Sequence, residues 1–332
     1  MQGRKLPGSN LLHTILVTAL VATGMPARAQ DWPSRPPTMV VPFAAGGPVD
    51  VLGRILAQYL GEAIGKPVVV DNISGGGGMS GSLRVSQAAP DGYMFVLGSI
   101  GTHALAQSLS KKPLYDAAAD FTPVALIADV GHVLIARRDL PADDLKSFID
   151  YVRANQGRMQ FGSGGAGTSS HIACVLLNQA IGVDVTHVPY RGGGPALADL
   201  IAGRTDYLCN IASTVGPAIE AKEVKAIAAL SRARSPILPG LPSAHEQGLD
   251  GFDAYTWNAV FLPKGTPAPI VQKLNAALVQ VMDNPAFRER LATLGLIVVA
   301  PERRTPAYLQ AFVAHEIAKW AVPIHASGVT ED

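Results

Sequence analysis

Cysteine is scarce in this sequence: Cys174 and Cys209 are the only two among 332 residues. Two cysteines without histidines at metal-ligand spacing argue against a structural zinc site. In an oxidising compartment the pair can form one disulfide, although a chain of this size does not require such a bond. The sequence does not give the distance between them, so their pairing stays open.

The sequence also lacks an excess of charge of one sign and a long apolar run. It carries 27 basic and 26 acidic residues, and charged residues make up only 16% of the chain. Proteins that bind nucleic acid present basic surfaces, so this balance argues against a nucleic-acid partner. Nothing reaches the roughly 18 apolar residues that a membrane-spanning helix needs. The small share of charge instead fits a layered α/β protein with much buried surface.

The N-terminus has the pattern of a secretory signal peptide. Arg4 and Lys5 come before an apolar run over residues 11–21, and the Ala-Arg-Ala of residues 27–29 follows. A charged start, a short apolar middle and a small-residue cleavage site are typical of exported proteins. We therefore expect residues 1–29 to be removed and the mature protein to lie in the periplasm. The remainder is long enough for about two domains.

Strands and helices are expected to alternate along the mature chain. Residues 39–43 predict a buried strand, and the helix that follows has apolar side chains at helical spacing up to Leu60. The same order of strand, glycine-rich loop and helix returns at residues 159–181. Such alternation predicts a mostly parallel sheet with helices on both faces. Residues 121–136 fit either two short strands or one connecting strand.

Two α/β lobes follow from this order, with the chain crossing between them near Asp129 and near Gly251. Lobe 1 is expected to comprise residues 30–130 and 254–332, and lobe 2 residues 131–253. Ligands of such sheets lie at the carboxyl ends of the strands, where the loops gather.

Two predicted helices begin at glycine-rich loops that leave the backbone accessible. The first loop, Ala44 to Gly47, has no bulky side chain, and the second spans Gly162 to Gly167. The first amides of a helix have no partner inside the helix, and the helix dipole adds positive potential at that end. Such a start attracts an anion without a lysine or arginine. Two of them, far apart in the sequence, predict the binding of a small organic acid.

Two glycine patterns suggest other functions but lack the context that these need. Residues 76–81 and 162–167 match G-x-G-x-x-G between a strand and a helix, which is typical of dinucleotide sites. In both cases the acidic residue that should close the next strand is missing. A G-x-S-x-G nucleophile elbow is absent too, because Phe161 stands two places before Ser163. An alternative of a different class is an exported hydrolase that uses Ser163 or Ser99 with His171 or His103.

Several segments, in this order and spacing, resemble one protein family, the Bug-type periplasmic solute receptors. These are the substrate-binding components of tripartite tricarboxylate transporters. The segments are residues 41–50, 89–93, 121–124, 167–171, 188–192, 195–200 and 262–267. The resemblance covers essentially the whole mature chain. It implies a type II periplasmic binding protein fold, in which two lobes joined by two crossover strands close on one small carboxylate.

Carried over by position, the resemblance implies a ligand held from both lobes by backbone and side chains. The implied ligand-binding residues are Phe43, Ala44, Ala45, Gly46, Gly47, Asp50, Ser99, Thr102, Ser163, Gly164, Ala166, Gly167, Thr168, His171, Tyr190, Arg191 and Asn210. No catalytic residue, metal or cofactor is implied. From the residues alone, Arg191 is equally well a solvated cation in a turn, and His171 a capping residue near a helix end.

Two departures from the family pattern bear on the ligand. Residues 73–75 read Ile-Ser-Gly where Arg-Pro-Gly is frequent, and Asn210 stands where Asp is usual. If that Asp holds a ligand ammonium in other members, an amino acid ligand is disfavoured here.

The sequence therefore predicts a non-catalytic extracytoplasmic receptor for a small carboxylate, either a dicarboxylate or an aromatic carboxylate. It is expected to be a monomer. The expected partners are the membrane subunits of a tripartite tricarboxylate transporter or the ectodomain of a sensor kinase. A regulatory module of the same two-lobed fold is disfavoured by the signal peptide and by the lack of a DNA-binding segment.

Overall fold

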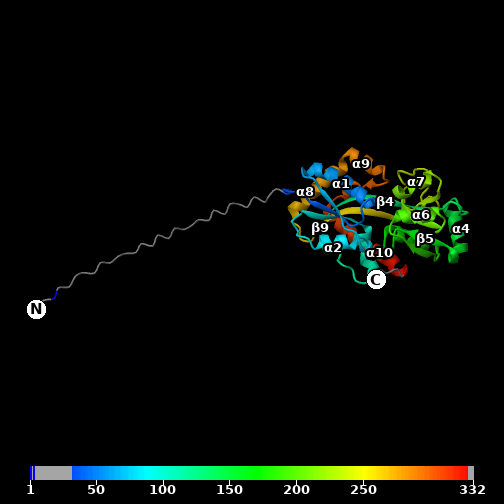
Figure 1. Cartoon of the computed structure of the whole chain (residues 1–332), viewed down its shortest axis with the longest axis horizontal. Coiled ribbons are helices and arrows are strands. Elements are labelled where there is room, and N and C mark those ends of the chain that lie inside the picture. Colours follow the sequence, from blue (N-terminus) through cyan, green and yellow to red (C-terminus); the bar gives the residue numbers. More distant parts are fainter. Residues whose placement is uncertain (2, 4–31, 328–332) are drawn as a thin grey trace. The chain divides into compact units, whose positions relative to one another are not determined.

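The computed structural model describes residues 1, 3 and 32–327, so the expected cleavage site of the signal peptide lies outside the described residues. Strands and helices alternate through most of the chain (Figure 1). In chain order the elements are β1 (Thr38–Val41), α1 (Pro48–Ile64), β2 (Val69–Asn72), η1 (Gly76–Gly78), α2 (Met79–Ser86), β3 (Met94–Ser99), η2 (Gly101–Leu105), α3 (Ala106–Leu109), β4 (Phe121–Arg137), α4 (Leu145–Asn155), η3 (Gln156–Arg158), β5 (Gln160–Ser163), α5 (Ser169–Ile181), β6 (Thr186–Pro189), α6 (Gly193–Ile201), β7 (Tyr207–Ile211), α7 (Ala212–Glu220), β8 (Val224–Ala229), β9 (Tyr255–Pro263), α8 (Ala268–Asp283), α9 (Pro285–Ala292), β10 (Ile297–Val298), η4 (Pro301–Arg303) and α10 (Pro306–Ser327).

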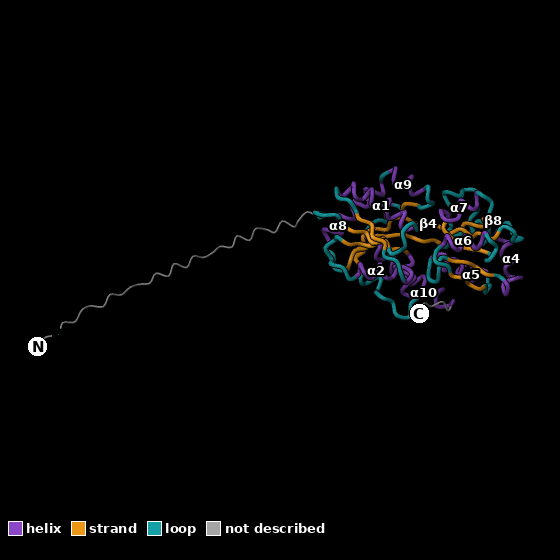
Figure 2. Tube along the Cα trace, viewed as in Figure 1, coloured by secondary structure: helices purple, strands orange, loops and turns teal. Residues whose placement is uncertain are grey.

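The strands of the described residues join one ten-stranded sheet (Figure 2). Its order is β2-β1-β3-β9-β4-β7-β5-β6, and β8 and β10 also pair with β4. The pairings of β1 with β2 and β3, and of β5 with β6 and β7, are parallel. The pairings of β4 and β9 are all antiparallel. The expectation of a mostly parallel sheet is therefore wrong at the centre, because β4 and β9 run as connectors between two parallel halves.

β4 is a single strand of 17 residues that belongs to both halves of the sheet. Its first part pairs with β9, from Phe121 opposite Pro263 to Gly131 opposite Tyr255. From His132 onward it pairs with β7, and it also pairs with β8. Of the two alternatives for residues 121–136, the chain forms the connecting strand.

Separate hydrophobic cores lie on either side of this crossing. We use lobe 1 for the part around the first core, which includes β1, β3, α1, α8 and α9, and lobe 2 for the part around the other cores, which includes β5, β7 and α4 to α7. Figure 1 shows α1, α8 and α9 toward one end and α4, α6 and α7 toward the other. The lobe boundaries expected at residues 130/131 and 253/254 stay a prediction.

Local sequence fixes where α1 begins and ends. Pro48 is its first residue, where a missing N–H costs nothing, and Gly65 ends it with a left-handed φ of 68°. Gly53 allows a close approach to the sheet, because a Cβ there would lie 2.8 Å from Val41 Cγ2. The N-terminus of α1 is thereby held at the carboxyl end of β1.

Cys174 of α5 and Cys209 of β7 form a disulfide, with their Cα atoms 5.4 Å apart, which answers the question that the sequence leaves open. The helical segments η2, α3 and α7 are not expected from the sequence, because they follow strands with almost no turn residues between. None of the helices within residues 32–327 is long and apolar enough to cross a membrane.

Candidate functional site

The loop between β1 and α1 exposes backbone amides. Residues 44–46 are exposed, and Gly47 caps α1 without a hydrogen bond from any side chain. Within the described chain, no hydrogen-bond partner is found for the amides of Ala44, Ala45, Val49 and Asp50. This start of α1 has the free donors that the sequence predicts.

Asp50 is buried in the first turn of α1 and braces this loop. Its carboxylate accepts hydrogen bonds from the Gly46 amide at 2.8 Å, from Arg54 Nε at 2.9 Å and from Asn72 Nδ2 at 2.9 Å. Burial opposes the charged form, but the hydrogen bonds from Arg54, Gly46 and Asn72 hold the pKa of Asp50 below its ordinary value. These donors all belong to the protein, so the carboxylate acts on the shape of the loop.

Asn72 and Gly78 are residues of this region that the sequence reasoning missed. Asn72 Nδ2 also donates to the Phe43 carbonyl at 3.1 Å. Its position at the carboxyl end of the parallel strand β2 is the signal that points to it. A Cβ on Gly78 would lie 2.6 Å from Thr102 Cγ2 and 3.0 Å from Phe43 Cζ. The ends of β1 and β3 and the turn η1 therefore meet.

Ser99 and Thr102, at the end of β3, are buried and bonded to each other. The Ser99 amide donates to Thr102 Oγ1 at 3.0 Å, and Oγ1 lies 3.2 Å from the Ser99 carbonyl, to which it donates. Thr102 Oγ1 also lies 2.8 Å from His103 Nδ1. His103 is fully buried, and this burial lowers its pKa to about 3. Thr102 Oγ1 is therefore already bonded within the protein, whereas no hydrogen bond of Ser99 Oγ or of His103 Nε2 is found within residues 32–327.

The loop before α5 is held mainly by its own side chains. Three of its amides donate within the segment, namely Gly164 to Ser170 Oγ at 2.9 Å, Gly165 to Ser163 Oγ at 3.1 Å and Gly167 to His171 Nδ1 at 3.2 Å. Thr168 caps α5, because its Oγ1 accepts from the His171 amide at 3.4 Å. The amides of Ala166, Ser169 and Ser170 have no partner in the described chain. The free donors are thus fewer than the glycine count suggests.

Ser163 pairs with a histidine, but the partner is His187 and not His171. Its Oγ lies 2.7 Å from His187 Nε2 and donates to the Gly165 carbonyl at 3.0 Å. The rings of His171 and His187 stack with centroids 3.8 Å apart. Burial lowers the pKa of His171 to about 3, with a smaller effect of His187, and burial lowers the pKa of His187 to about 4. Ser163 is fully buried, and its histidine partner differs from the His171 that the hydrolase alternative expects.

His187 lies on β6, and no sequence signal identifies it. It reaches Ser163 because β6 pairs with β5 in the register that places Phe161 beside it. A single sequence does not reveal such a register.

Three more predicted residues lie at the ends of β6 and β7. Tyr190 OH donates to Asp199 Oδ2 at 2.8 Å, and burial followed by Asp199 raises the pKa of Tyr190. Arg191 is exposed, and no side-chain interaction of Arg191 is found within residues 32–327. Asn210 lies close to the start of α6, because a Cβ on Gly193 would come within 2.5 Å of its Nδ2.

The predicted residues thus form two groups, each at the carboxyl ends of parallel strands. In lobe 1 they follow β1 and β3, and in lobe 2 they lie at the ends of β5, β6 and β7. His132 Nε2 of β4 lies 3.2 Å from the Oγ of Ser169, the first residue of α5. Ile100 and Ile172 line a small space of about 10 Å³ between the two parts.

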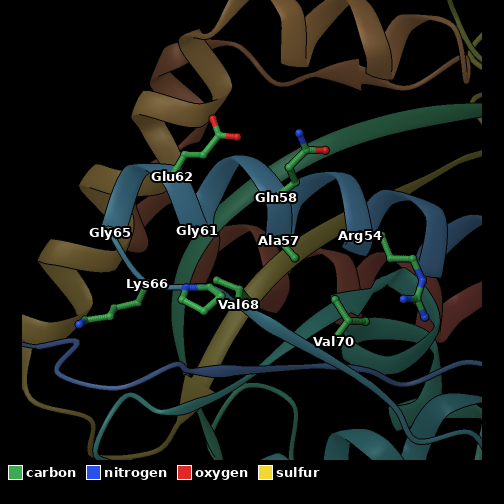
Figure 3. Close-up of a pocket in the computed structure, with 10 residues that line it drawn as sticks. Arg54, Ala57, Gln58, Gly61, Glu62, Gly65, Lys66, Val68 and Val70 are labelled. Atoms are coloured by element: carbon green, nitrogen blue, oxygen red, sulfur yellow. The ribbon is translucent and has the colours of Figure 1, made fainter.

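A larger groove of about 670 Å³ lies along α1 (Figure 3), and one of its lining residues, Arg54, is hydrogen-bonded to Asp50 of the lobe 1 group. The residues that line it come from α1, from the turn after it and from β2: Arg54, Ala57, Gln58, Gly61, Glu62, Gly65, Lys66, Pro67, Val68 and Val70. None of the predicted ligand-binding residues lines it. Its size alone does not make it the ligand site, since it has no helix start and opens widely to solvent.

Comparison with protein-family models matches residues 52–329 to the tripartite tricarboxylate transporter family receptor. The chain belongs to this receptor family. Members of known structure resemble it over most of their length. The periplasmic binding protein BugD is 38% identical, with a TM-score of 0.82 over 91% of this chain and 100% of BugD.

Two receptor structures contain ligands. MatC from Rhodopseudomonas palustris, with bound malate, is 40% identical and has a TM-score of 0.80 over 88% of this chain and 99% of its own. A second R. palustris protein, with adipate, is 33% identical and has a TM-score of 0.83 over 90% of this chain and 99% of its own. These likenesses confirm the family and the type II periplasmic binding protein fold expected from the sequence. The receptor family is one of periplasmic solute-binding proteins.

Proposed function

We propose that this receptor binds a small organic carboxylate between lobes 1 and 2 and leaves it chemically unchanged. The observation that carries the proposal is the presence, in each lobe, of a helix start with unpartnered amides. In lobe 1 this is α1, and in lobe 2 it is α5.

The strength of such contacts suits a transport receptor. A hydrogen bond to a charged group contributes about 1.5–3 kcal/mol, and micromolar affinity needs about 8 kcal/mol in total. Amides on two helix starts can supply this without a buried cation. In this scheme Asp50, Thr102 and Ser163 act through the backbone that they hold, since the polar atoms of their side chains are bonded to the protein. The other residues inferred from the resemblance contact the ligand.

A dicarboxylate fits this arrangement best, with one carboxylate at each lobe. The malate of MatC and the adipate of the second R. palustris protein are both dicarboxylates, which supports this choice. An aromatic monocarboxylate is the second candidate, because the loops are rich in alanine and glycine and Phe43 lies beside them.

The proposed role is the delivery of the bound acid to the membrane subunits of a tripartite tricarboxylate transporter, or to the ectodomain of a sensor kinase. The protein acts in the periplasm as a monomer after export. Binding closes the lobes about the strands β4 and β9. Uptake of the labelled acid by cells with and without the gene separates the two roles, since a sensing receptor leaves uptake intact.

A thermal-shift screen of the purified protein against mono-, di- and tricarboxylates tests the binding. A ligand that binds only the folded state at about 100 times its Kd stabilises that state by about 2.7 kcal/mol, and we expect a rise in Tm of about 5 °C or more. Titration calorimetry should then give a micromolar Kd for a dicarboxylate. If no carboxylate raises Tm, the proposal is wrong.

A separate measurement tests the absence of catalysis. After incubation with the protein, the bound acid should be recovered unchanged by NMR, and ester and amide substrates should not be hydrolysed. Hydrolysis that is abolished in Ser163→Ala would instead support the enzyme. The matched variant Ser169→Ala is the control: any hydrolysis that comes from Ser163 or from a contaminant should be the same in this variant as in the unaltered protein.

A further inference from the structure

Asn210 holds a buried donor that the protein itself does not use. The residue is only 6% exposed. Its Oδ1 accepts the Ile211 amide at 2.8 Å, and this bond fixes the orientation of the side chain, because only the oxygen can accept. Its Nδ2 is buried and has no hydrogen-bond partner in the described chain. Buried donors without partners are rare in folded proteins, so this one requires an explanation.

The free Nδ2 faces the start of α6. A Cβ placed on Gly193, the first residue of α6, would lie 2.5 Å from this nitrogen. Gly192 caps the helix without a side-chain hydrogen bond. The amides of Gly193 and Gly194 have no partner in the described chain. A Cβ on Gly164 would lie 3.3 Å from the Gly193 nitrogen, so these donors adjoin the loop before α5.

The unpartnered polar groups at the start of α6 are of one kind. Its polar groups that lack partners are N–H donors, and the α6 dipole adds positive potential. The carboxylate on the same helix, Asp199, already binds Tyr190 and Arg204. An oxygen acceptor would satisfy the donors, whereas an ammonium, which can only donate, would leave them without a partner.

We propose that Asn210 and the first amides of α6 form a subsite that selects an oxygen acceptor of the ligand and rejects an ammonium. This rests on the proposed function, and it narrows the substrate class to acids that carry a carboxylate, carbonyl or hydroxyl oxygen at this point. The 2-amino analogues of such acids are excluded.

The test uses matched pairs of ligands. Succinate and L-malate are compared with L-aspartate, adipate with L-2-aminoadipate, and phenylacetate with L-phenylglycine, each by titration calorimetry. For the unaltered protein we expect the best-bound acid to exceed its amino analogue by about 100-fold in affinity. Equal affinity within such a pair overturns the subsite.

Two variants at the same position separate donor from acceptor. Asn210→Asp keeps the oxygen that accepts the Ile211 amide but replaces the free donor by an acceptor. We expect it to weaken the acid by about tenfold or more and to shift the acid-to-amine ratio toward the amine by about tenfold or more. Asn210→Ala should weaken the acid without any gain for the amino analogue.

Asn284→Asp is the control, because it makes the same change at the cap of α9 in lobe 1, where the side chain accepts hydrogen bonds from the amides of Ala286 and Phe287. It should leave every ratio unaltered. Unchanged acid binding in Asn210→Ala overturns the subsite even if Asn210→Asp does not fold. If no acid of the panel binds the unaltered protein, the carboxylate receptor itself is wrong, and the subsite with it.

Discussion

At the scale of single residues, the charged carboxylate of Asp50 stabilises the conformation of the loop before α1. It is nearly fully buried, and three donors of the protein surround its carboxylate. Hydrogen bonds to a charged group are stronger than neutral ones, and an unmatched buried group is costly. The shape of the loop over residues 44–47 therefore depends on a side chain that the ligand need not touch.

Asp50→Asn tests this support. The substitution keeps the size but turns one acceptor oxygen into a donor that faces other donors. We expect the free energy of unfolding, measured with urea, to fall by about 2–3 kcal/mol. Carboxylate affinity should fall about tenfold because the loop loses its brace. The exposed Asp71→Asn on β2 is the matched control and should change the free energy of unfolding by less than about 0.5 kcal/mol. Equal behaviour of the two variants would contradict the bracing role.

Four histidines make the stability depend on pH. Burial lowers the pKa of His103 and His171 to about 3 and that of His132 and His187 to about 4, from an ordinary value of 6.5. Below pH 6.5 these four histidines bind protons in the unfolded chain but stay neutral in the folded protein. Stability therefore falls as the pH falls from 6.5 toward 4, and these groups have no effect on it above 6.5.

His103→Phe should remove one part of this dependence. The phenyl ring can keep the stacking on Phe261, whose ring lies 3.9 Å from that of His103. Between pH 7.5 and pH 5 one such histidine costs about 2 kcal/mol of unfolding free energy, so the variant should lose about that much less than the parent. Urea denaturation at both pH values measures it. The exposed His315→Phe should follow the parent, and a parallel loss in His103→Phe would refute the assignment.

At the scale of elements, local signals predict the helices that begin the site. Pro48 and Gly65 bound α1, and the glycines that follow β5, with Thr168 after them, mark the start of α5. The loops at their starts depend on short stretches of chain, so the sequence reveals them. The partners of the loops depend on the register between strands, which is why the bonds of Asp50 to Asn72 and of Ser163 to His187 escape prediction.

The antiparallel centre of the sheet escapes prediction for the same reason. Phe121 of β4 pairs with Pro263 of β9, and nothing in the sequence near either residue specifies the other. α7 is hidden because it follows β7 directly and contains Pro217. Fold class is predictable from alternation and from the family motifs, whereas strand order is not.

The start of α6 allows a paired test of close approach. A Cβ on Gly193 would collide with the anchored Asn210 side chain, whereas no atom lies within 4 Å of a Cβ on Gly194. Gly193→Ala should lower the free energy of unfolding by about 1–3 kcal/mol and weaken carboxylate binding. Gly194→Ala should raise the free energy by up to about 1 kcal/mol, because alanine favours the helix. Urea denaturation and calorimetry decide, and equal effects of the two variants would show that α6 tolerates a side chain at Gly193.

At the scale of the whole molecule, α10 fastens the region where the lobes join. Glu316 of α10 is fully buried, and its carboxylate accepts from Tyr255 OH at 2.9 Å, Trp257 Nε1 at 3.0 Å and Trp320 Nε1 at 2.9 Å. Tyr255 and Trp257 lie at the start of strand β9, where the chain returns from lobe 2. Burial and then the charge of Glu316 raise the pKa of Tyr255.

Glu316→Leu should be strongly destabilising, because it leaves three donors buried without an acceptor. We expect a loss of about 3–5 kcal/mol in the free energy of unfolding, followed by circular dichroism so that the altered tryptophan environment does not interfere. Glu316→Gln keeps one acceptor and should lose less. Glu302→Leu, at an exposed position, is the control, and a similar small loss in both leucine variants would refute the fastening role.

The continuity of β4 limits how such receptors can be recombined. Its first part is hydrogen-bonded to β9 and its second part to β7 and β8. A chimaera that takes one lobe from a relative must therefore match a foreign set of partner strands along one part of β4 while it keeps the original partners along the other, and a one-residue slip would turn every side chain to the opposite face. Exchanging the loops at the strand ends leaves that ladder untouched, which makes the loops the natural units for transplanting specificity from one receptor to another.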